Sequence, residues 1–205
     1  PQSWGLTGKG CGLSSVWTDL DQDGDLDIIV ANDFGFFVER SYVYRNDGPT
    51  ENGGWSFVEV GAEFGLHRPL YGMGIGVFDA NRDGFLDYYF TSIGRDLMLH
   101  TVGSGGVVDA TENSGLGGTW SDMGYRTKWA PITLDMDGDG WDDLYVRTGH
   151  VPAYWFIGNP SEQTDLPYVF GPNGEATLVE DVAPEAGEMG RGGETADLTG
   201  DGIRD

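Results

Sequence analysis

A nine-residue acidic motif occurs four times along the 205-residue chain, and this repetition restricts the fold more than any other feature. Each copy fits the pattern D-x-[D/N/T]-x-D-G-x-x-D. The copies begin at residues 19, 79, 135 and 197, so consecutive copies start 60, 56 and 62 residues apart. Periods of this length are typical of arrays in which one supersecondary unit packs on the next. The sequence therefore predicts a tandem array of similar units.

A Gly-Leu pair precedes the motif in the first three units and sets the boundaries that we predict. We place the repeats at 5–64, 65–114, 115–186 and 187–205, the last of them truncated. The chain thus holds about 3.4 repeats, whereas closed propellers need roughly four to eight blades. Since an isolated arc would expose an apolar blade face, we expect the rest of the same propeller to lie beyond Asp205.

Each repeat has the pattern of four short strands. In the second unit we expect strands at 73–78, 86–92, 96–101 and 106–111, separated by glycine-rich turns and without helical periodicity. Four such strands are typical of one blade of a β-propeller. The strand that follows the acidic motif is almost continuously apolar, as expected when neighbouring blades cover both of its faces. The predicted fold class is all-β, part of a β-propeller of four-stranded blades with the acidic loop between the first and second strands of each blade.

The acidic motif has the ligand spacing of a calcium loop. Calcium prefers about six to eight oxygen ligands in a flexible cage, and side chains at positions 1, 3 and 5 of a tight loop converge on one point. A main-chain carbonyl at position 7 and a carboxylate at position 9 would complete the shell. We therefore expect one Ca²⁺ per loop, up to four in all, held by these candidate ligands: Asp19, Asp21, Asp23, Asp25, Asp27; Asp79, Asn81, Asp83, Phe85, Asp87; Asp135, Asp137, Asp139, Trp141, Asp143; Asp197, Thr199, Asp201, Ile203, Asp205.

The motif also resembles two other kinds of loop. A single loop of this kind also fits a plain polar turn, since Asp, Asn and Gly are common there. Four copies in register favour the ion, because clustered carboxylates raise one another's pKa when no cation is near. An EF-hand needs Glu at position 12, where this chain has Val30, Phe90 and Val146. The sequence therefore excludes an EF-hand.

Positions 6 and 3 of the acidic motif predict the turn conformation and the relative calcium affinity of the loops. Every loop has glycine at position 6, which predicts a turn with positive φ. The first and third loops each have four liganding carboxylates, whereas Asn81 and Thr199 replace one in the second and fourth. Because affinity follows ligand charge, we expect the first and third loops to bind calcium more tightly.

Composition excludes several classes of partner. The chain has 11 Lys and Arg residues against 34 Asp and Glu residues, a formal net charge of −23. Such a chain repels the phosphate backbone and anionic membrane surfaces, so nucleic acid is not an expected partner. No apolar run approaches the ~18 residues of a membrane span, so membrane insertion is not expected either. Its basic residues are scattered along the sequence, with no basic cluster for an anionic ligand. The one cysteine, Cys11, excludes an internal disulfide and is expected to be a small buried residue.

The acidic loops and their apolar flanking strands resemble the FG-GAP/VCBS repeats of integrin α-subunit propellers. The segments around 57–66 and 71–74, together with the motif at 79–87, are also similar to secreted bacterial repeat proteins related to cartilage acidic protein, of the ASPIC/UnbV type. The resemblance covers essentially the whole chain. It implies a calcium-bound propeller of seven or eight blades that is secreted or displayed at the cell surface and is often adhesive.

Function is expected at loops rather than in the scaffold. The longer loops at 117–128 and 149–172 carry aromatic residues that could stack on sugars or anchor a protein: Trp120, Tyr125, Tyr154, Trp155 and Phe156. Our first hypothesis is a non-catalytic binding or adhesion module for a protein or glycan, since no catalytic spacing is visible. The alternatives are the propeller portion of a secreted polysaccharide-active enzyme and an architectural subunit. Open calcium loops favour an extracellular, cell-surface or periplasmic location in a bacterium.

Overall fold

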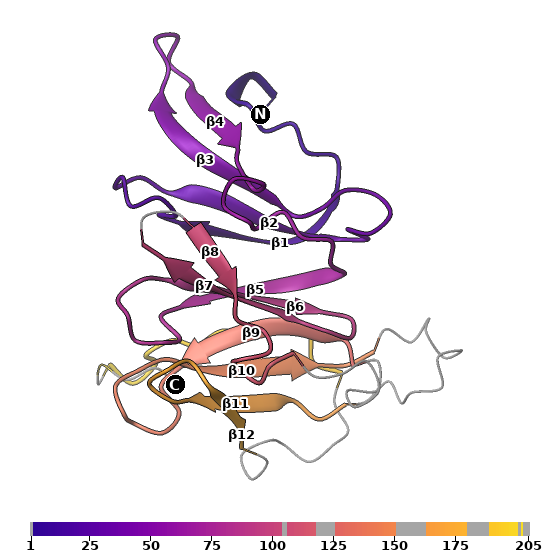
Figure 1. Cartoon of the computed structure of the whole chain (residues 1–205), viewed down its shortest axis with the longest axis vertical. Coiled ribbons are helices and arrows are strands. Elements are labelled where there is room, and N and C mark those ends of the chain that lie inside the picture. Colours follow the sequence, from indigo (N-terminus) through magenta and orange to yellow (C-terminus); the bar gives the residue numbers. More distant parts are fainter. Residues whose placement is uncertain are drawn as a thin grey trace.

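A computed structural model of the chain describes residues 2–103, 106–117, 126–150, 163–179, 189–200 and 202. These residues form a short 3₁₀ turn, η1 (Gln2–Trp4), and three antiparallel sheets of four strands (Figure 1). The sheets contain β1 (Cys11–Thr18), β2 (Asp27–Asp33), β3 (Tyr42–Pro49) and β4 (Trp55–Glu59); β5 (Gly72–Phe78), β6 (Asp87–Ser92), β7 (Leu97–Val102) and β8 (Gly106–Asp109); and β9 (Lys128–Leu134), β10 (Asp143–Thr148), β11 (Leu166–Phe170) and β12 (Ala176–Leu178).

Every sheet is a meander in which each strand pairs with the next one along the chain. The four strands of the second sheet lie within one or two residues of those expected from the sequence, and the prediction of four-stranded propeller blades is confirmed. We call the three sheets blade 1, blade 2 and blade 3. The exact repeat boundaries stay a prediction, since the connections between blades belong to either neighbour.

The blades stack face to face, and their first strands make the closest approach (Figure 1). Strand β5 lies against β1 and β2 on one side and against β9 on the other. Glycines in β5 permit this packing. A Cβ atom on Gly74 would lie 2.3 Å from the carbonyl oxygen of Trp129 in β9, a distance at which no side chain fits. The close packing of β5 against β9 therefore requires glycine in β5.

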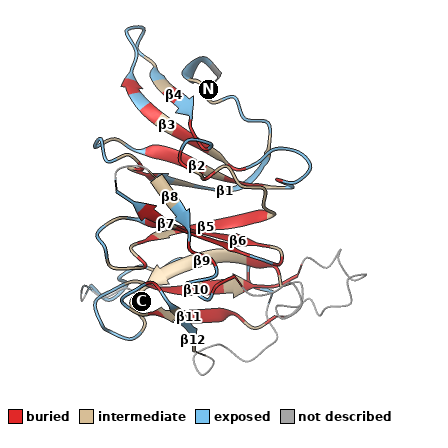
Figure 2. Ribbon diagram, in the orientation of Figure 1, coloured by how far each residue is buried: buried red, intermediate tan, exposed pale blue. Residues whose placement is uncertain are grey.

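Most of the hydrophobic core lies in two layers between the blades (Figure 2), and a third, smaller cluster lies in blade 1. The layer between blades 1 and 2 contains Ile29, Val43 and Phe90, none of which is exposed. The layer between blades 2 and 3 contains Tyr89 and Leu144, which are equally buried. Alternate residues of β6 thus face opposite blades, and all six of its residues are buried. For β6, this confirms that the apolar strand after the acidic loop is covered on both faces.

One sequence expectation about packing is wrong. Cys11 is exposed rather than buried, because it is the first residue of β1, the edge strand of blade 1. Among the described residues, no helix has the length and apolar character that crossing a bilayer requires.

Candidate metal centres

The acidic loops connect the first and second strands of the blades, as the sequence predicts. Loops 19–26, 79–86 and 135–142 close the hairpins β1–β2, β5–β6 and β9–β10. All three hairpins have the same register, because the residue before position 1 pairs with position 9: Thr18 with Asp27, Phe78 with Asp87, and Leu134 with Asp143. We refer to them as loops 1, 2 and 3, and to the segment that starts at Asp197 as loop 4.

The carboxylate at position 1 shapes each loop by accepting backbone hydrogen bonds. Its Oδ2 accepts from the N–H of the position 6 glycine at 3.2, 2.9, 2.8 and 2.8 Å in loops 1 to 4. These glycines have φ values of 95°, 88°, 90° and 89°, so the positive-φ turn is confirmed. They are Gly24, Gly84, Gly140 and Gly202.

The carboxylate at position 9 is buried and joins the loop to the third strand of its blade. Asp27, Asp87 and Asp143 are 0%, 0% and 1% exposed. In blade 2, the oxygens of Asp87 accept from Ala80 N–H at 3.0 Å and from Thr101 N–H in β7 at 2.8 Å. The same two contacts recur around Asp27 and Asp143. Because a carboxylate has about four lone-pair sites, each oxygen can still accept a cation.

Burial makes these position 9 carboxyls hard to ionise in the absence of a cation. It raises the pKa of Asp87 to about 7, although the N–H groups of Thr101 and Ala80 oppose the shift. Burial likewise raises the pKa of Asp27 and of Asp143. Nearby carboxylates of the same loops add to the shift. A positive ion in the loop would remove this penalty, since an opposite charge favours the ionised form.

The donor atoms of loops 1 and 3 converge on one point. In loop 1, single oxygens of Asp19, Asp21 and Asp27 lie within 4.8 Å of one another, and Asp135, Asp137 and Asp143 are arranged in the same way. Loop 1 also has two buried carboxylate oxygens without a hydrogen-bond partner, Oδ1 of Asp21 and Oδ1 of Asp25. An unpaired buried carboxylate oxygen is unfavourable unless it binds a cation. The residues therefore fit a hard divalent ion.

Loop 2 is arranged alike but has an amide at position 3. The Nδ2 of Asn81 donates to Oδ2 of Asp83 at 3.0 Å, and its Oδ1 accepts from Asp83 N–H at 3.1 Å. The Asn81 amide thus offsets part of the negative charge of Asp83 without an ion. The lower calcium affinity of this loop stays a prediction. The N–H groups of the position 7 residues each donate to the position 5 carboxylate at 3.0 Å, in the order Asp25, Phe85 and Trp141. That their carbonyl oxygens bind calcium stays a prediction.

Loop 4 begins in the same way as the others. Asp197 accepts from the N–H of Gly200 at 2.5 Å and from that of Gly202 at 2.8 Å. Thr199 is described, whereas the candidate ligands Asp201, Ile203 and Asp205 lie outside the described residues. The aromatic residues that the sequence indicates at 120, 125 and 154–156 also lie outside them.

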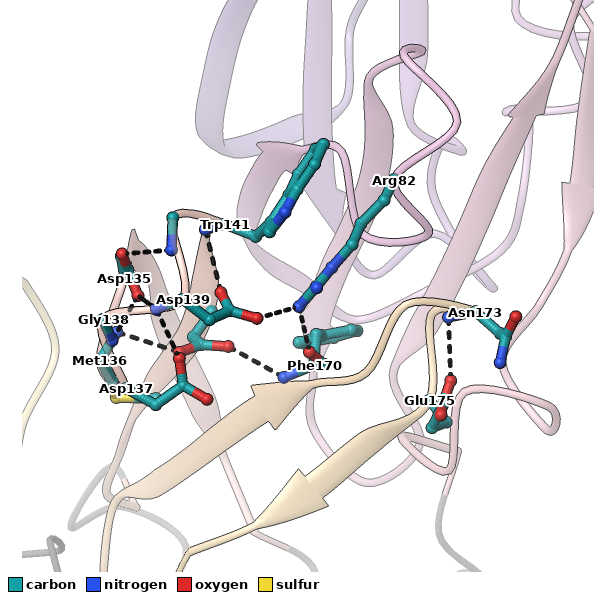
Figure 3. Close-up of polar contacts among 12 residues, drawn as sticks. Arg82, Asp135, Met136, Asp137, Gly138, Asp139, Trp141, Phe170, Asn173 and Glu175 are labelled. Carbon is teal, nitrogen blue, oxygen red and sulfur yellow. Dashed lines mark hydrogen bonds and ion pairs between the residues drawn. The ribbon is translucent and has the colours of Figure 1, made fainter.

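An arginine joins loops 2 and 3, a contact that sequence reasoning missed. Arg82, at position 4 of loop 2, extends across to blade 3 (Figure 3). Its Nη2 lies 2.5 Å from Oδ2 of Asp139 and 2.9 Å from the carbonyl oxygen of Phe170. Its guanidinium lies 5.3 Å from the ring centre of Trp141. Position 4 varies freely in the motif, so no sequence signal marks this residue.

Comparison with known families gives a match over residues 19–90, from loop 1 to β6, with the model described as FG-GAP-like repeat. Integrin alpha-7 of Mus musculus is 31% identical over 167 residues, and that of Rattus norvegicus is 29% identical over 167. The chain is an FG-GAP-like repeat protein. Both alignments cover 74% of it but only 13% and 14% of the two integrins, so it spans a small part of these relatives.

Among solved structures, an Agrocybe aegerita lectin studied for its recognition of non-reducing terminal N-acetylglucosamine overlaps with this FG-GAP-like chain at a TM-score of 0.37. The two are 16% identical, and the overlap covers 80% of this chain and 36% of the lectin. This likeness is too weak to bear on fold or ligand. The closer similarity to cartilage acidic protein stays a prediction.

Proposed function

We propose that this FG-GAP-like chain is part of a calcium-stabilised β-propeller that acts outside the cell, or in a periplasm, as a non-catalytic binding module for a protein or glycan. The single observation that carries the proposal is the convergence of three carboxylates within 4.8 Å in loops 1 and 3. Millimolar calcium outside cells suits open oxygen-ligand loops. The similarity to integrin α-subunits supports binding as the role.

Calcium would act structurally by holding each hairpin to its blade. The position 9 carboxylate already accepts a hydrogen bond from a backbone N–H in the third strand of its blade. An ion shared between that carboxylate and the loop side chains would fix the loop against the blade. At ten times its dissociation constant, one bound ion adds about 1.4 kcal/mol to the unfolding free energy. Several such sites are comparable with the net stability of a domain.

We also propose that a further blade covers the outer face of blade 1. A hollow of about 590 Å³ there is lined almost entirely by apolar residues, among them Trp17, Trp55 and Phe57. Trp17 is 59% exposed. The residue next to it across the hairpin, Ile28, faces this hollow. Its counterparts in blades 2 and 3, Tyr88 and Leu144, are covered by the preceding blade and are 1% and 0% exposed.

The test of the proposed function is a calcium titration followed by calorimetry and by thermal unfolding. Calcium should raise the melting temperature of the full chain, a chelator should lower it, and magnesium should not replace calcium. Asp21→Asn and Asp137→Asn should each weaken one of the tighter sites, whereas Glu51→Gln, in an exposed turn, should change neither. A melting temperature that is the same in calcium and in chelator would contradict the structural role of the ion.

A further inference from the structure

A hollow of about 450 Å³ lies between blades 1 and 2, at the ends of the strands opposite the acidic loops. Its walls come from the β2–β3, β4–β5 and β6–β7 connections and from the segment after β8. Small-molecule sites have roughly this size, typically 300–1,000 Å³, and combine apolar walls with a few polar groups. The lining residues used below are Phe36, Arg68, Tyr71, Arg95 and Asp109.

Aromatic side chains gather on one side of the hollow, where Phe36 and the half-buried Tyr71 belong to its lining. We call Phe34, Phe36, Phe37 and Tyr71 the aromatic rim. The rings of the three phenylalanines lie 6.4, 5.4 and 6.4 Å from that of Tyr71. Phe36 and Phe37 are 53% and 76% exposed. Exposed rings gathered in this way mark a binding surface, because burying them against one another inside the protein would be more favourable.

The backbone of the β2–β3 connection holds these rings in place. Phe34 has a φ of 56°, which is unusual for a bulky residue and marks a constrained turn. Its carbonyl oxygen accepts from Phe37 N–H at 2.8 Å and from Val38 N–H at 2.9 Å. The N–H of Gly35 donates to the carbonyl oxygen of Leu70 at 2.8 Å. The turn is thereby tied to the connection that carries Tyr71, so that the rim is preorganised.

The opposite wall is polar, and its charges are balanced. Arg68 pairs with Asp109 at 3.4 Å, and Arg95 pairs with Glu112. The side chains of the first pair are 39% and 42% exposed, and those of the second are 41% and 74% exposed. Exposed pairs contribute little to stability, at most about 1 kcal/mol, so they can rearrange around a ligand. The lining itself holds two arginines and two aspartates, Arg68, Arg95, Asp96 and Asp109, whereas Glu112 lies outside it. This wall therefore offers guanidinium donors and carboxylate acceptors without a formal net charge.

We propose that this hollow binds one uncharged sugar residue of a glycan. A sugar hydroxyl is both donor and acceptor, so neighbouring hydroxyls can bond with an arginine and a carboxylate at the same time. The apolar C–H face of the ring would lie on Phe36 or Tyr71. The inference deepens the proposed function, on which it rests, by choosing a glycan as the partner of the loop face.

Charge and shape distinguish this ligand from two others. An acidic sugar or an acidic peptide would meet arginines that are already neutralised, on a chain with a net charge of −23, which repels anions. A protein partner needs roughly 800 Å² of contact surface on each side, for which a small concave site is poorly suited. An uncharged ring that fits the hollow needs neither a net positive field nor a large flat surface.

The test is an array of immobilised neutral, sialylated and uronic-acid glycans, probed with the full chain in calcium. We expect neutral glycans to be bound, and the methyl glycoside of the preferred sugar to bind in calorimetry. Phe36→Ala and Arg95→Gln should each weaken that binding at least tenfold without lowering the melting temperature. Leu13→Ala removes an equally exposed apolar side chain, 52% exposed, from the same blade, and Arg45→Gln breaks an exposed pair elsewhere. Both controls should bind as the wild type does.

Three results would overturn this inference: no glycan is bound, only acidic glycans are bound, or the two variants bind like the wild type. If calcium still stabilises the chain in any of these cases, the sugar site fails while the proposed calcium-dependent module stands. If calcium has no effect on stability, the proposed function fails whatever the array shows.

Discussion

The guanidinium of Arg82 and the carboxylate of Asp139 join two neighbouring acidic loops, with Nη2 and Oδ2 only 2.5 Å apart. The two residues are 57 positions apart in sequence and belong to different blades. Figure 3 shows that Asp139 faces the other carboxylates of loop 3 on one side and Arg82 on the other. A positive side chain from loop 2 is therefore part of the electrostatic environment of the candidate ion in loop 3.

From this contact we predict that Arg82→Gln strengthens calcium binding in loop 3. The guanidinium competes with the ion for Asp139, so its removal should raise the affinity by about three- to tenfold. In chelator the same variant should be less stable than the wild type by about 1 kcal/mol, because Asp139 loses its partner. Calorimetry with calcium and urea unfolding in chelator measure the two effects. Arg68→Gln, whose pair lies at the opposite ends of the strands, is the control, and weaker calcium binding by Arg82→Gln would refute the competition.

A second prediction concerns the turn of loop 3. Gly140→Ala should destabilise the chain by about 1–2 kcal/mol, because φ of 90° is strained for any residue with a Cβ atom. There is open space around this position, so the effect is conformational rather than steric. Gly192, which also has open space but no positive φ, provides the matched control in Gly192→Ala. Equal melting temperatures of the two variants would show that the turn tolerates a side chain.

The buried carboxyl of Asp87 gives a third prediction, on pH. Its folded pKa of about 7 lies above the ordinary value of 3.8, so the folded state holds a proton that the unfolded state has released. In chelator, wild-type stability should therefore fall, relative to Asp87→Asn, by about 2–3 kcal/mol from about pH 5 to about pH 8. The two histidines whose pKa burial lowers, His100 and His150, are present in both proteins and cancel in the difference.

Calcium should abolish this pH dependence, since the bound ion favours the ionised carboxylate throughout the range. Urea unfolding of both proteins across the pH range, with and without calcium, measures the difference. A constant difference between wild type and variant in chelator would mean that Asp87 ionises normally in the fold.

A fourth prediction concerns a buried ion pair between blades 2 and 3. Lys128 is 0% exposed and its Nζ lies 3.2 Å from Oδ1 of Asp96, which also accepts from Ser92 N–H at 2.9 Å. Lys128→Met should destabilise the chain by about 3–5 kcal/mol, because it leaves a buried carboxylate without its cation. Adding Asp96→Asn should recover at least half of the loss, since an amide can still accept from Ser92 and donate to the hydroxyl of Tyr89. Urea unfolding measures both, and a double variant no more stable than the single one would contradict this reasoning.

The sequence by itself determined the local features of the chain. The acidic loops of the three blades, the positive-φ glycine at position 6 and the four strands of blade 2 could all be predicted, because each depends on residues that are near in sequence. Position 6, which is Gly140 in loop 3, is glycine in every copy of the motif because the turn there requires a positive φ. Cys11 shows the limit even here, since its exposure depends on which strand lies at the edge of a sheet.

Only the tertiary structure decided which distant side chains meet. Arg68 and Arg95 look scattered along the sequence, yet the fold brings both to one hollow. Blade packing brings Arg82 to Asp139 and Lys128 to Asp96. The motif does not predict these pairs, because the sequence pattern of a repeat specifies the strands and loop of one blade. Contacts between blades depend on how two repeats pack against each other. Local backbone preferences fix the hairpin and its carboxylates, and long-range packing fixes what surrounds them.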